Sequence, residues 1–405
     1  MAKSILTSAA FMANPHPVLQ DLVARGPITQ SKIPFLGKMN FLTHHNAVME
    51  MLKSSDRFVV DGRNAGKRSQ IPIPYMPKTF KLLMSNMLSL DDPDHRRLRK
   101  IADKTFRTAN IEALRPAIAA MADALLDKME AKGETDLMQG YFDVLPLLVI
   151  CELLGLEAED RDRLTDEIRS FADISSVLGV FKISPAIKRM SNYLRAEFDE
   201  VRKNPKPGLI SEFVKLADTD EDRLSENELL SMVFVLFIAG HETTKNLLSC
   251  AVPCLLNHPE QLNNLREDSA LWPMAVEELI RFTSPVQMTK PRYVVRDMEF
   301  HGQKMRKGQM FMALLSAANI DPAYFEAPLS FNIHREKVRH VGFGNGVHLC
   351  LGIQLARVEA QIALERLFIR YPELSLAIPQ DQLVWAKRLG SRGLKQLPVR
   401  FFAHE

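Results

Sequence analysis

The chain has 405 residues, enough to bury a large core, and by length alone it could form two or three domains. Hydrophobic residues make up 46% and charged residues 25%, as in ordinary globular proteins, and a net charge of +3 is too small to indicate a nucleic-acid partner. The four cysteines are too few and too scattered for a disulfide framework, and the eleven histidines form no metal-binding pattern with them.

The chain offers no candidate for a membrane span. Residues 1–13 hold only a short apolar patch before two prolines, with no clear cleavage site of a signal peptide. The longest apolar run, residues 229–240, is also shorter than the roughly 20 residues that cross a bilayer. We therefore expect a cytoplasmic protein without a membrane partner, beginning with an arm of about residues 1–14.

The first third of the chain predicts a small sheet, a loop and a basic helix. Residues 33–60 carry short β-prone pieces, and residues 61–90 read as a long loop with one or two short helices. Asp92 and Pro93 predict a helix start, as the N-cap and the first helical residue. His95 and Arg99 share one face of that helix. The residues alone leave open whether this is a solvated basic face or a site for an anion.

The middle of the chain predicts one very long helix. Residues 111–200 read as several amphipathic helices, and Ser225–Glu228 then form a capping box that opens a helical pattern reaching about Asn257. Such a helix is roughly 45–50 Å long. An acid follows Gly240 and His241 at its centre, where a buried charge is costly unless it is paired or functional. The alternative is a glycine kept for close packing beside a surface glutamate.

A further helix and a β-rich segment follow. Pro273 opens the helix, on which Glu278 and Arg281 lie three residues apart, a spacing that is common among surface ion pairs of little energetic value. Residues 291–319 alternate in the manner of strands, with turns at His301-Gly302 and Lys307-Gly308.

The segment Phe343–Gly352 is the most informative in the chain. It places Cys350 among glycines just before a helix, where unpaired N–H groups and the helix dipole favour a thiolate. A lone cysteine is more often a small buried hydrophobe, and a glycine-rich loop could also hold a phosphate. This loop lacks the Lys-Ser/Thr ending of a nucleotide P-loop, however.

Six positions of this segment resemble the haem-binding loop of the cytochrome P450 monooxygenases: Phe343, Gly344, Gly346, His348, Cys350 and Gly352. The resemblance runs from about residue 15 to residue 402. It implies a mainly α fold, a single cytochrome P450 domain over residues 1–405 with small peripheral β-sheets and a buried haem b. Cys350 would be the axial ligand of the haem iron, with Phe343, Gly344 and Gly352 lining the cofactor.

The resemblance implies roles for further residues. Four match ligands of the haem propionates, for which arginine offers forked hydrogen bonds: His95, Arg99, Arg292 and His348. The centre of the long helix matches the oxygen-activating motif, with Ala239 beside the haem, Gly240 at the oxygen site, and Glu242 and Thr243 as an acid–alcohol pair. A structural ion network would join Glu278, Arg281 and Arg335.

The resemblance also implies partners. No flavin or nicotinamide fingerprint appears, so electrons would come from a ferredoxin and its reductase, docking on a basic face that we predict from Arg96, Arg97, Lys100 and Arg357. The other reactants would be O2 and a hydrophobic small molecule such as a terpenoid, steroid or aromatic, and the protein would be a monomer. Two alternatives are a peroxide-driven peroxygenase, whose helix typically lacks the acid–alcohol pair, and a non-catalytic haem-thiolate sensor.

In the resembled family, residues 61–90 roof the substrate pocket and residues 171–193 form a lid over its entrance. Candidate wall residues are Met76, Leu83, Met84 and Met87. Gln287 and Arg392 could meet a polar group of the substrate, although satisfaction within the protein is the simpler reading for both.

Overall fold

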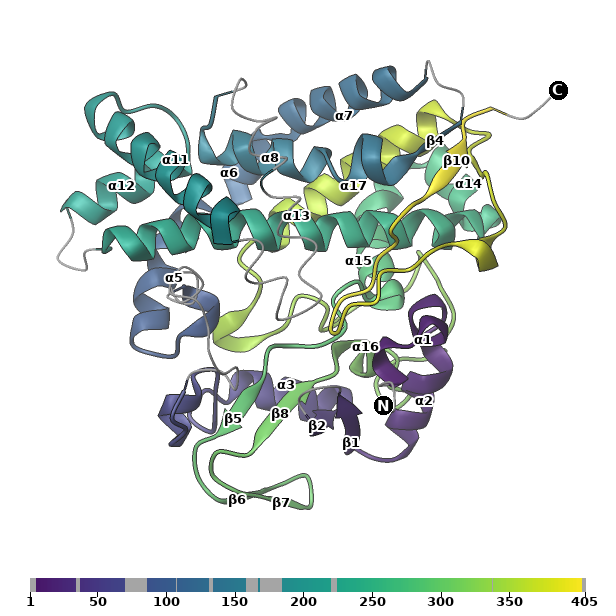
Figure 1. Ribbon diagram of the computed structural model, residues 1–405. Coiled ribbons are helices and arrows are strands. Elements are labelled where there is room, and N and C mark those ends of the chain that lie inside the picture. The colour runs from purple at the N-terminus through teal and green to yellow at the C-terminus, as the bar shows by residue number, and fades with distance from the viewer. Residues whose placement is uncertain are drawn as a thin grey trace.

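The computed structural model describes residues 5–402 apart from 34–36, 70–85, 107, 131–133, 158–166, 168–183, 220–223 and 337. Helices form the larger part of the molecule, and a five-stranded sheet lies at the opposite end from the helix bundle (Figure 1). Among the helices described, none is both long enough and apolar enough to span a bilayer.

The long predicted helix is α13, Glu226–Leu256, and it forms the centre of the bundle (Figure 1). The capping box is confirmed, because Ser225 Oγ accepts a hydrogen bond from the Glu228 N–H while Glu228 Oε2 accepts one from the Ser225 N–H. Its neighbours include α8 (Leu145–Leu154), α15 (Trp272–Thr283) and α17 (Ile353–Arg370), and α7 (Arg115–Glu130) packs on α17 and α8.

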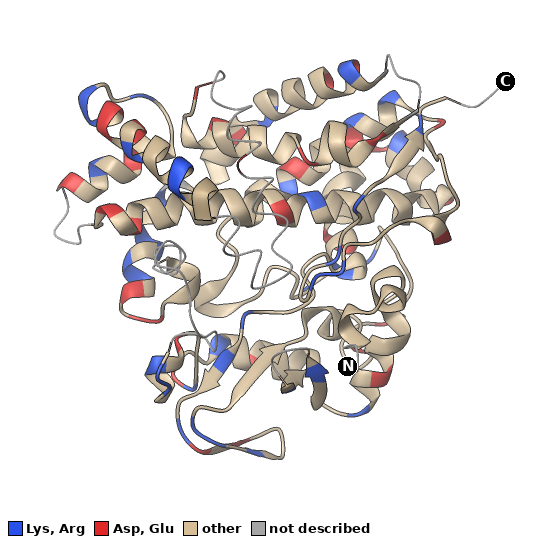
Figure 2. Cartoon of the chain, viewed as in Figure 1, with Lys and Arg blue, Asp and Glu red and all other residues tan. Residues whose placement is uncertain are grey.

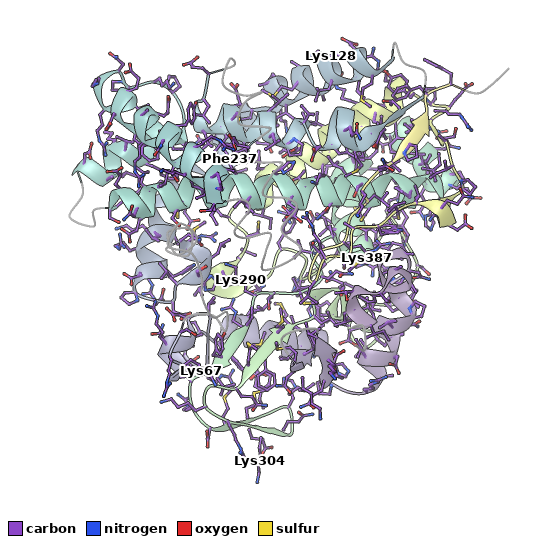
Figure 3. The ribbon with its side chains drawn as sticks, viewed as in Figure 1. Lys67, Lys128, Phe237, Lys290, Lys304 and Lys387 are labelled. Atoms are coloured by element: carbon purple, nitrogen blue, oxygen red, sulfur yellow. The ribbon has the colours of Figure 1, made fainter. Side chains whose placement is uncertain are left out.

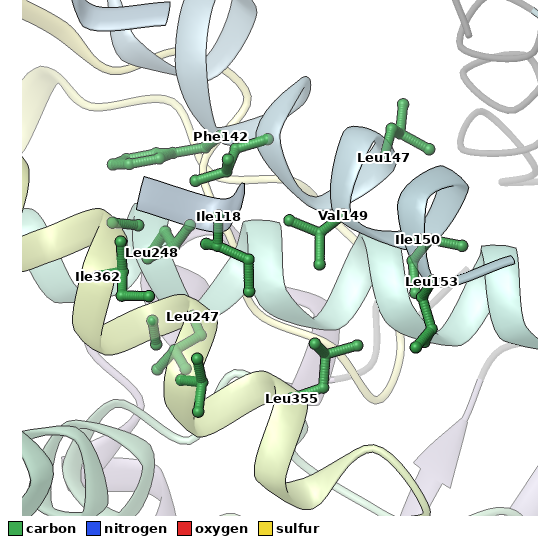
Figure 4. Close-up of a cluster of buried hydrophobic side chains, with 14 of the residues drawn as sticks. Ile118, Phe142, Leu147, Val149, Ile150, Leu153, Leu247, Leu248, Leu355 and Ile362 are labelled. Atoms are coloured by element: carbon green, nitrogen blue, oxygen red, sulfur yellow. The ribbon is translucent and has the colours of Figure 1, made fainter. Parts of the chain in front are cut away.

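Apolar side chains fill the space between α8, α13 and α17 (Figure 4). Val149 and Ile150 of α8 lie on one side, with Leu248 of α13 and Leu355 of α17 on the others. Gly240 belongs to this contact, because a Cβ atom there would lie 2.5 Å from Ile150 Cδ1. Close packing of α8 on α13 therefore explains the glycine.

The remaining helices of the described chain are shorter or peripheral: η1 (Ile5–Thr7), α1 (Ala9–Ala13), α2 (His16–Ala24), α3 (His45–Lys53), η2 (Gly62–Ala65), η3 (Met87–Ser89), α5 (Asp94–Thr105), α6 (Thr108–Ala113), η4 (Met138–Phe142), α11 (Ser184–Lys203), α12 (Leu209–Thr219), α14 (Pro259–Glu267), η5 (Ser269–Leu271), α16 (Leu315–Ala318), η6 (Gly346–His348) and η7 (Gln380–Gln382). The N-terminal arm is partly folded, since Leu6, Phe11 and Met12 are buried.

The main sheet has the strand order β1-β2-β8-β5-β3. Its strands are β1 (Ile28–Ile33), β2 (Gly37–Leu42), β3 (Phe58–Val59), β5 (Arg292–Val294) and β8 (Met310–Ala313). All pairs are antiparallel except β2 with β8, and Arg292 lies opposite Phe311. Two smaller sheets pair β6 (Met298–Phe300) with β7 (Gln303–Met305), and β4 (Glu134–Asp136) with β10 (Pro398–Arg400) and β9 (Ser375–Leu376).

The small sheet predicted for residues 33–60 is present as β2 and β3, and between them lies α3, an amphipathic helix whose Val48 and Met51 are buried against the sheet. One local prediction was wrong by a residue: the basic helix α5 begins at Asp94, so Pro93 is the N-cap and Asp92 stands before it. Asp92 instead holds Arg96 through a 2.6 Å contact between Oδ2 and Nη2.

Candidate functional site

The Cys350 loop is a tight turn fixed by backbone contacts. The Cys350 N–H donates to the Phe343 carbonyl at 3.0 Å, and Gly344 and Gly346 both have φ near +70°, a conformation that favours glycine. A Cβ atom on Gly346 would lie 2.1 Å from the Leu52 carbonyl oxygen of α3. Gly352 is the N-cap of α17, so Cys350 stands just before a helix, as predicted.

Burial has the larger effect on the Cys350 thiol, and it raises its pKa. The Gly352 backbone N–H and the charges of Arg99 and Arg357 act in the opposite direction. The Gly352 N–H therefore favours the thiolate, as expected at a helix N-terminus, but in the protein by itself burial outweighs this effect. Coordination to a metal would deprotonate this sulfur.

Cations gather next to this loop. The rings of His95 and His348 lie 4.2 Å apart, and burial, followed by the charges of Arg292, His95, Lys290 and Arg99, lowers the pKa of His348 to about 2. Burial lowers the pKa of Arg292 to about 10, and within the described chain its Nε has no hydrogen-bond partner. The charged forms of these side chains are destabilised because the groups are desolvated and lie beside one another. A bound anion would stabilise the charged forms.

Lys290 is a member of this cluster that sequence reasoning missed. Its amine donates to Ser89 Oγ at 3.0 Å, and burial together with Arg292 lowers its pKa to about 8. The side chain is still accessible to solvent, and it lies between α13 and the main sheet (Figure 3). Its position two residues before Arg292, on the same face of an extended segment, is the signal that could have identified it.

Arg99 ties the cluster to the cysteine loop. Its Nη1 donates to the Leu349 carbonyl, and its Nε donates to Asp103 Oδ1 at 2.8 Å. The helix that carries His95 and Arg99 is therefore anchored one residue before Cys350.

The central turn of α13 has one accessible face. Ala239 and Thr243 are exposed and Ile238 is 36% exposed, whereas most of the helix is buried. The Thr243 hydroxyl donates to the Ala239 carbonyl at 2.6 Å. Glu242 forms an ion pair with Arg388, which sequence reasoning also missed.

Arg388 comes from a C-terminal loop that is closed by the pairing of Trp385 with Leu394. This loop approaches α13 closely, since a Cβ atom on Gly393 would lie 2.0 Å from Asn246 Oδ1. Lys387, the neighbour of Arg388, lies on the same loop beneath α13 (Figure 3). A separation of 146 residues hides the pairing of Arg388 with Glu242 from sequence patterns.

A second network holds the other face of the same helical turn. His241 Nε2 lies 3.1 Å from Asp143 Oδ1, and the Lys245 amine donates to the same oxygen at 3.1 Å. Burial would raise the pKa of Asp143, but its contacts with His241 and Lys245 outweigh that effect and lower it. The turn is thus fixed to the start of α8 by a paired, partly buried carboxylate.

Glu278, Arg281 and Arg335 do meet. The Arg281 guanidinium binds Glu278 in a bidentate manner, with N···O distances of 2.7 Å, and Arg335 Nε lies 3.2 Å from both oxygens of the same carboxylate. Arg281 also donates to the carbonyls of Asn319, Pro328 and Ser330. The side chains of Glu278 and Arg281 are completely buried, so this is a core network and not a surface pair.

The predicted substrate contacts are only partly described. Arg392 is buried and donates to the carbonyls of Met12, Ala13 and Thr283, so its donors are already used within the protein. Gln287 is also buried, and in the described part of the chain its side-chain amide has no partner. Met87 is buried, while Met76, Leu83, Met84 and residues 171–183 of the predicted lid lie outside the described residues.

Comparison with known proteins decides the family. A family model described as "Cytochrome P450" matches residues 13–382. This chain belongs to the cytochrome P450 family. It is 38% identical over 401 residues to the vitamin D(3) 25-hydroxylase of Pseudonocardia autotrophica, with 97% of this chain and 95% of the relative covered. It is 35% identical over 393 residues to the polyketide biosynthesis cytochrome P450 PksS of Bacillus subtilis, with 96% of each chain covered.

The solved structures agree with the predicted fold. The myxobacterial cytochrome P450 CYP267B1, crystallised in complex with myristic acid, superposes with a TM-score of 0.89 at 35% identity, covering 98% of this chain and 99% of that one. The mainly α cytochrome P450 fold with small sheets is therefore confirmed. The chain is a cytochrome P450 monooxygenase, and its relatives include enzymes named as hydroxylases or as a monooxygenase.

The residues present fit the haem that the P450 family implies. An iron porphyrin needs one sulfur ligand and partners for two carboxylates. The structure brings Arg292 close to His348, two residues before Cys350, and the buried Nε of Arg292 lacks a partner among the described residues. A Cβ atom on Gly352 would meet no described atom within 4 Å, so the protein leaves room beside the cysteine.

Proposed function

We propose that this P450 uses haem b to insert one oxygen atom of O2 into a hydrophobic small molecule, with electrons supplied by a ferredoxin and its reductase. One observation carries the proposal: Cys350, just before α17, follows His348 by two residues, and His348 lies against His95 and close to the charges of Arg292, Lys290 and Arg99. Among the described residues, the buried Nε of Arg292 has no hydrogen-bond partner. That combination suits a group with a metal at its centre and carboxylates at its edge.

The cofactor-binding residues divide into two sets. Cys350 would hold the iron through its sulfur, and Phe343, Gly344 and Gly352 shape the loop around it. The propionates would be held by His95, Arg99, Lys290, Arg292 and His348. Haem supplies the electron-transfer and oxygen-activating chemistry when it is bound.

Thr243 and Glu242 would handle protons. The Thr243 hydroxyl, which donates to the Ala239 carbonyl, can turn to present its proton on the accessible face of α13. Glu242 would exchange protons with solvent, and Arg388 holds its carboxylate in place. For Gly240, the close packing against Ile150 supports a structural role, so we assign the handling of protons to Glu242 and Thr243 alone.

Electrons would arrive at a basic surface, because acidic donors are steered by positive charge. The four cations predicted for this docking surface differ in how accessible they are to a partner. Arg97 forms an ion pair with Glu228 and is only 22% exposed, and Arg357 binds Glu277 with N···O distances of 2.7 and 2.9 Å. Lys100 and Arg96 are exposed on α5, whose Lys and Arg are blue in Figure 2, and Arg96 remains 80% exposed in its pair with Asp92, so these two fit the docking role better.

The relatives support an apolar substrate. One is named for the 25-hydroxylation of vitamin D(3), one for polyketide biosynthesis, and a third was crystallised with myristic acid. We extend to this chain only what these molecules share, which is a largely hydrocarbon skeleton.

The test begins with the carbon-monoxide spectrum of the reduced, haem-loaded protein. We expect the strongly red-shifted band of thiolate coordination, its loss in Cys350→Ser, and its retention in Cys151→Ala, a control at a buried cysteine of α8. With ferredoxin, reductase and O2, a substrate that shifts the ferric spectrum should then yield a product one oxygen heavier. Absence of the red-shifted band, or its survival in Cys350→Ser, would refute the proposal. Product formed from peroxide alone would favour the peroxygenase, and no product in either assay would favour the sensor.

A further inference from the structure

The ring of Phe343 contacts two side chains that share one carboxylate. The first is His340, whose ring centroid lies 5.6 Å from that of Phe343 at an interplanar angle of 41°. The second is Arg357 of α17, whose guanidinium carbon lies 5.4 Å from the Phe343 centroid. From the sequence alone, Arg357 was predicted to dock a partner, and His340 had no predicted role.

Glu277 of α15 connects these two side chains. Arg357 Nε and Nη2 donate to its two oxygens at 2.7 and 2.9 Å, which is bidentate geometry. His340 Nε2 lies 3.3 Å from Oε2 of the same carboxylate. His340 Nδ1 accepts the Gly342 N–H at 3.0 Å, so the proton of the neutral imidazole is on Nε2, the ring nitrogen nearest to Glu277.

The carboxylate stays charged in this position. Burial would raise the pKa of Glu277, but its contacts with His340 and Arg357 outweigh burial and lower the pKa to about 2. The backbone beside it is also fixed, because a Cβ atom on Gly342 would lie 2.5 Å from Ile280 Cγ2. The segment before the cysteine is therefore held against α15 by packing and by charge.

The ring is coupled to the cysteine through the backbone, since the Cys350 N–H donates to the Phe343 carbonyl at 3.0 Å. We propose that Glu277 is a positioning residue, which acts through His340 and Arg357 to fix the Phe343 ring beside Cys350 and thereby sets the reduction potential of the bound haem. The apolar shell and the hydrogen bonds around a ligating sulfur control that potential. This inference rests on the proposed haem–thiolate function.

The test replaces Glu277 by Gln in the haem-loaded enzyme. The ring would be held less firmly, water would reach the sulfur more easily, and the ferrous state would become more favourable. We expect about a threefold rise in the ferrous-to-ferric ratio at a fixed applied potential, which is about 28 mV at 59 mV per tenfold change. Dye-mediated spectroelectrochemistry measures this ratio, and the carbon-monoxide band reports whether the sulfur remains bound.

Glu112→Gln is the matched control. Glu112 forms an ion pair with Arg115, and both line the same surface pocket of about 400 Å³ as Glu277 and Arg357, but neither contacts Phe343 in the described structure. The Glu112→Gln substitution also removes one negative charge from this pocket, so the ferrous-to-ferric ratio of that variant should differ from that of the wild type by less than 1.3-fold. A comparable shift in both variants would overturn the proposal, because it would show a general effect of surface charge.

A double-mutant cycle with Phe343→Leu separates positioning from charge. If Glu277 acts through the ring, Glu277→Gln should change the ratio less than 1.3-fold in the Leu background. An equal threefold shift in both backgrounds would overturn the inference. If Glu277→Gln does not retain haem, Arg357→Lys provides the same cycle, since it keeps the charge and loses the two-point contact. A wild-type protein without the red-shifted band would instead contradict the proposed function.

Discussion

The buried network of Glu278, Arg281 and Arg335 permits a quantitative prediction of stability. Glu278 and Arg281 have no exposed side-chain surface, so Arg281→Ala would leave a buried carboxylate and three carbonyls short of donors, at a cost of about 3–5 kcal/mol. Unfolding entropies of about 2.1 cal/mol/K per residue amount to roughly 0.85 kcal/mol/K for a chain of 405 residues. Dividing the free-energy cost by this entropy predicts that Arg281→Ala lowers the Tm by about 4–6 °C.

Differential scanning calorimetry of the haem-loaded variants at one scan rate measures this shift, and a fixed rate is needed because a cofactor protein of this size does not unfold in a two-state manner. Arg96→Ala is the control, since Arg96 is 80% exposed in its pair with Asp92 and should lose only about 1 °C. Arg335→Ala should fall between them, because Arg335 is 11% exposed and supplies one arm of the network. Equal shifts in Arg281→Ala and Arg96→Ala would refute the reasoning, and if Arg281→Ala does not fold, the order of Arg335→Ala and Arg96→Ala decides.

Three further predictions follow from the site. Thr243→Ala should keep consuming reductant while releasing peroxide in place of hydroxylated product, and an unchanged product yield would contradict the relay. Lys100→Gln should slow electron transfer from an acidic ferredoxin two- to fivefold at low salt, with the difference vanishing as ionic strength rises, whereas Lys304→Gln on the distant β6–β7 hairpin should have no effect (Figure 3). Burial raises the pKa of Glu359 in α17 from 4.5 to about 8, so the folded protein keeps a proton that the unfolded chain releases, and stability falls as pH rises from about 5 to 8 by up to about 1.4 kcal/mol per unit. The Glu359→Gln variant has no titrating group at this position, so its Tm should rise relative to that of the wild type as the pH increases from about 5 to 8. A constant difference in Tm between the two proteins over this pH range would exclude the effect.

The sequence was informative where chemistry depends on neighbours along the chain. The capping box that opens α13 and the position of Cys350 before α17 both follow from residues a few positions apart, and both are present in the structure. Local patterns predicted secondary structure less well where the same composition suits both a helix and a strand. The helix α3 occupies a segment whose short apolar pieces also suit strands, and its buried face against the sheet decides the outcome.

The polar partners within the site could not be predicted, because each joins distant segments. Glu242 meets Arg388 across 146 residues, His241 meets Asp143 across 98, and Arg357 meets Glu277 across 80. No periodicity relates such positions, and every one of them depends on how the helices pack. Arg357 shows the consequence. Its charge suggested an exposed docking residue, but its guanidinium group binds the Glu277 carboxylate and lies over the Phe343 ring.

The central turn of α13 shows why its charges are tolerated in an otherwise apolar helix. His241 faces the start of α8, where it and Lys245 of α13 both contact Asp143. Glu242 faces the C-terminal loop, where Arg388 neutralises it. Both neighbours of Thr243 on its N-terminal side are therefore fixed by partners from other segments. Because a buried charge without a partner would destabilise the helix by several kcal/mol, these two networks let the turn carry an acid while its remaining face stays open. The position of the acid is consequently linked to the C-terminal loop, so that a shift of this loop would alter the proposed proton relay without any change in α13 itself.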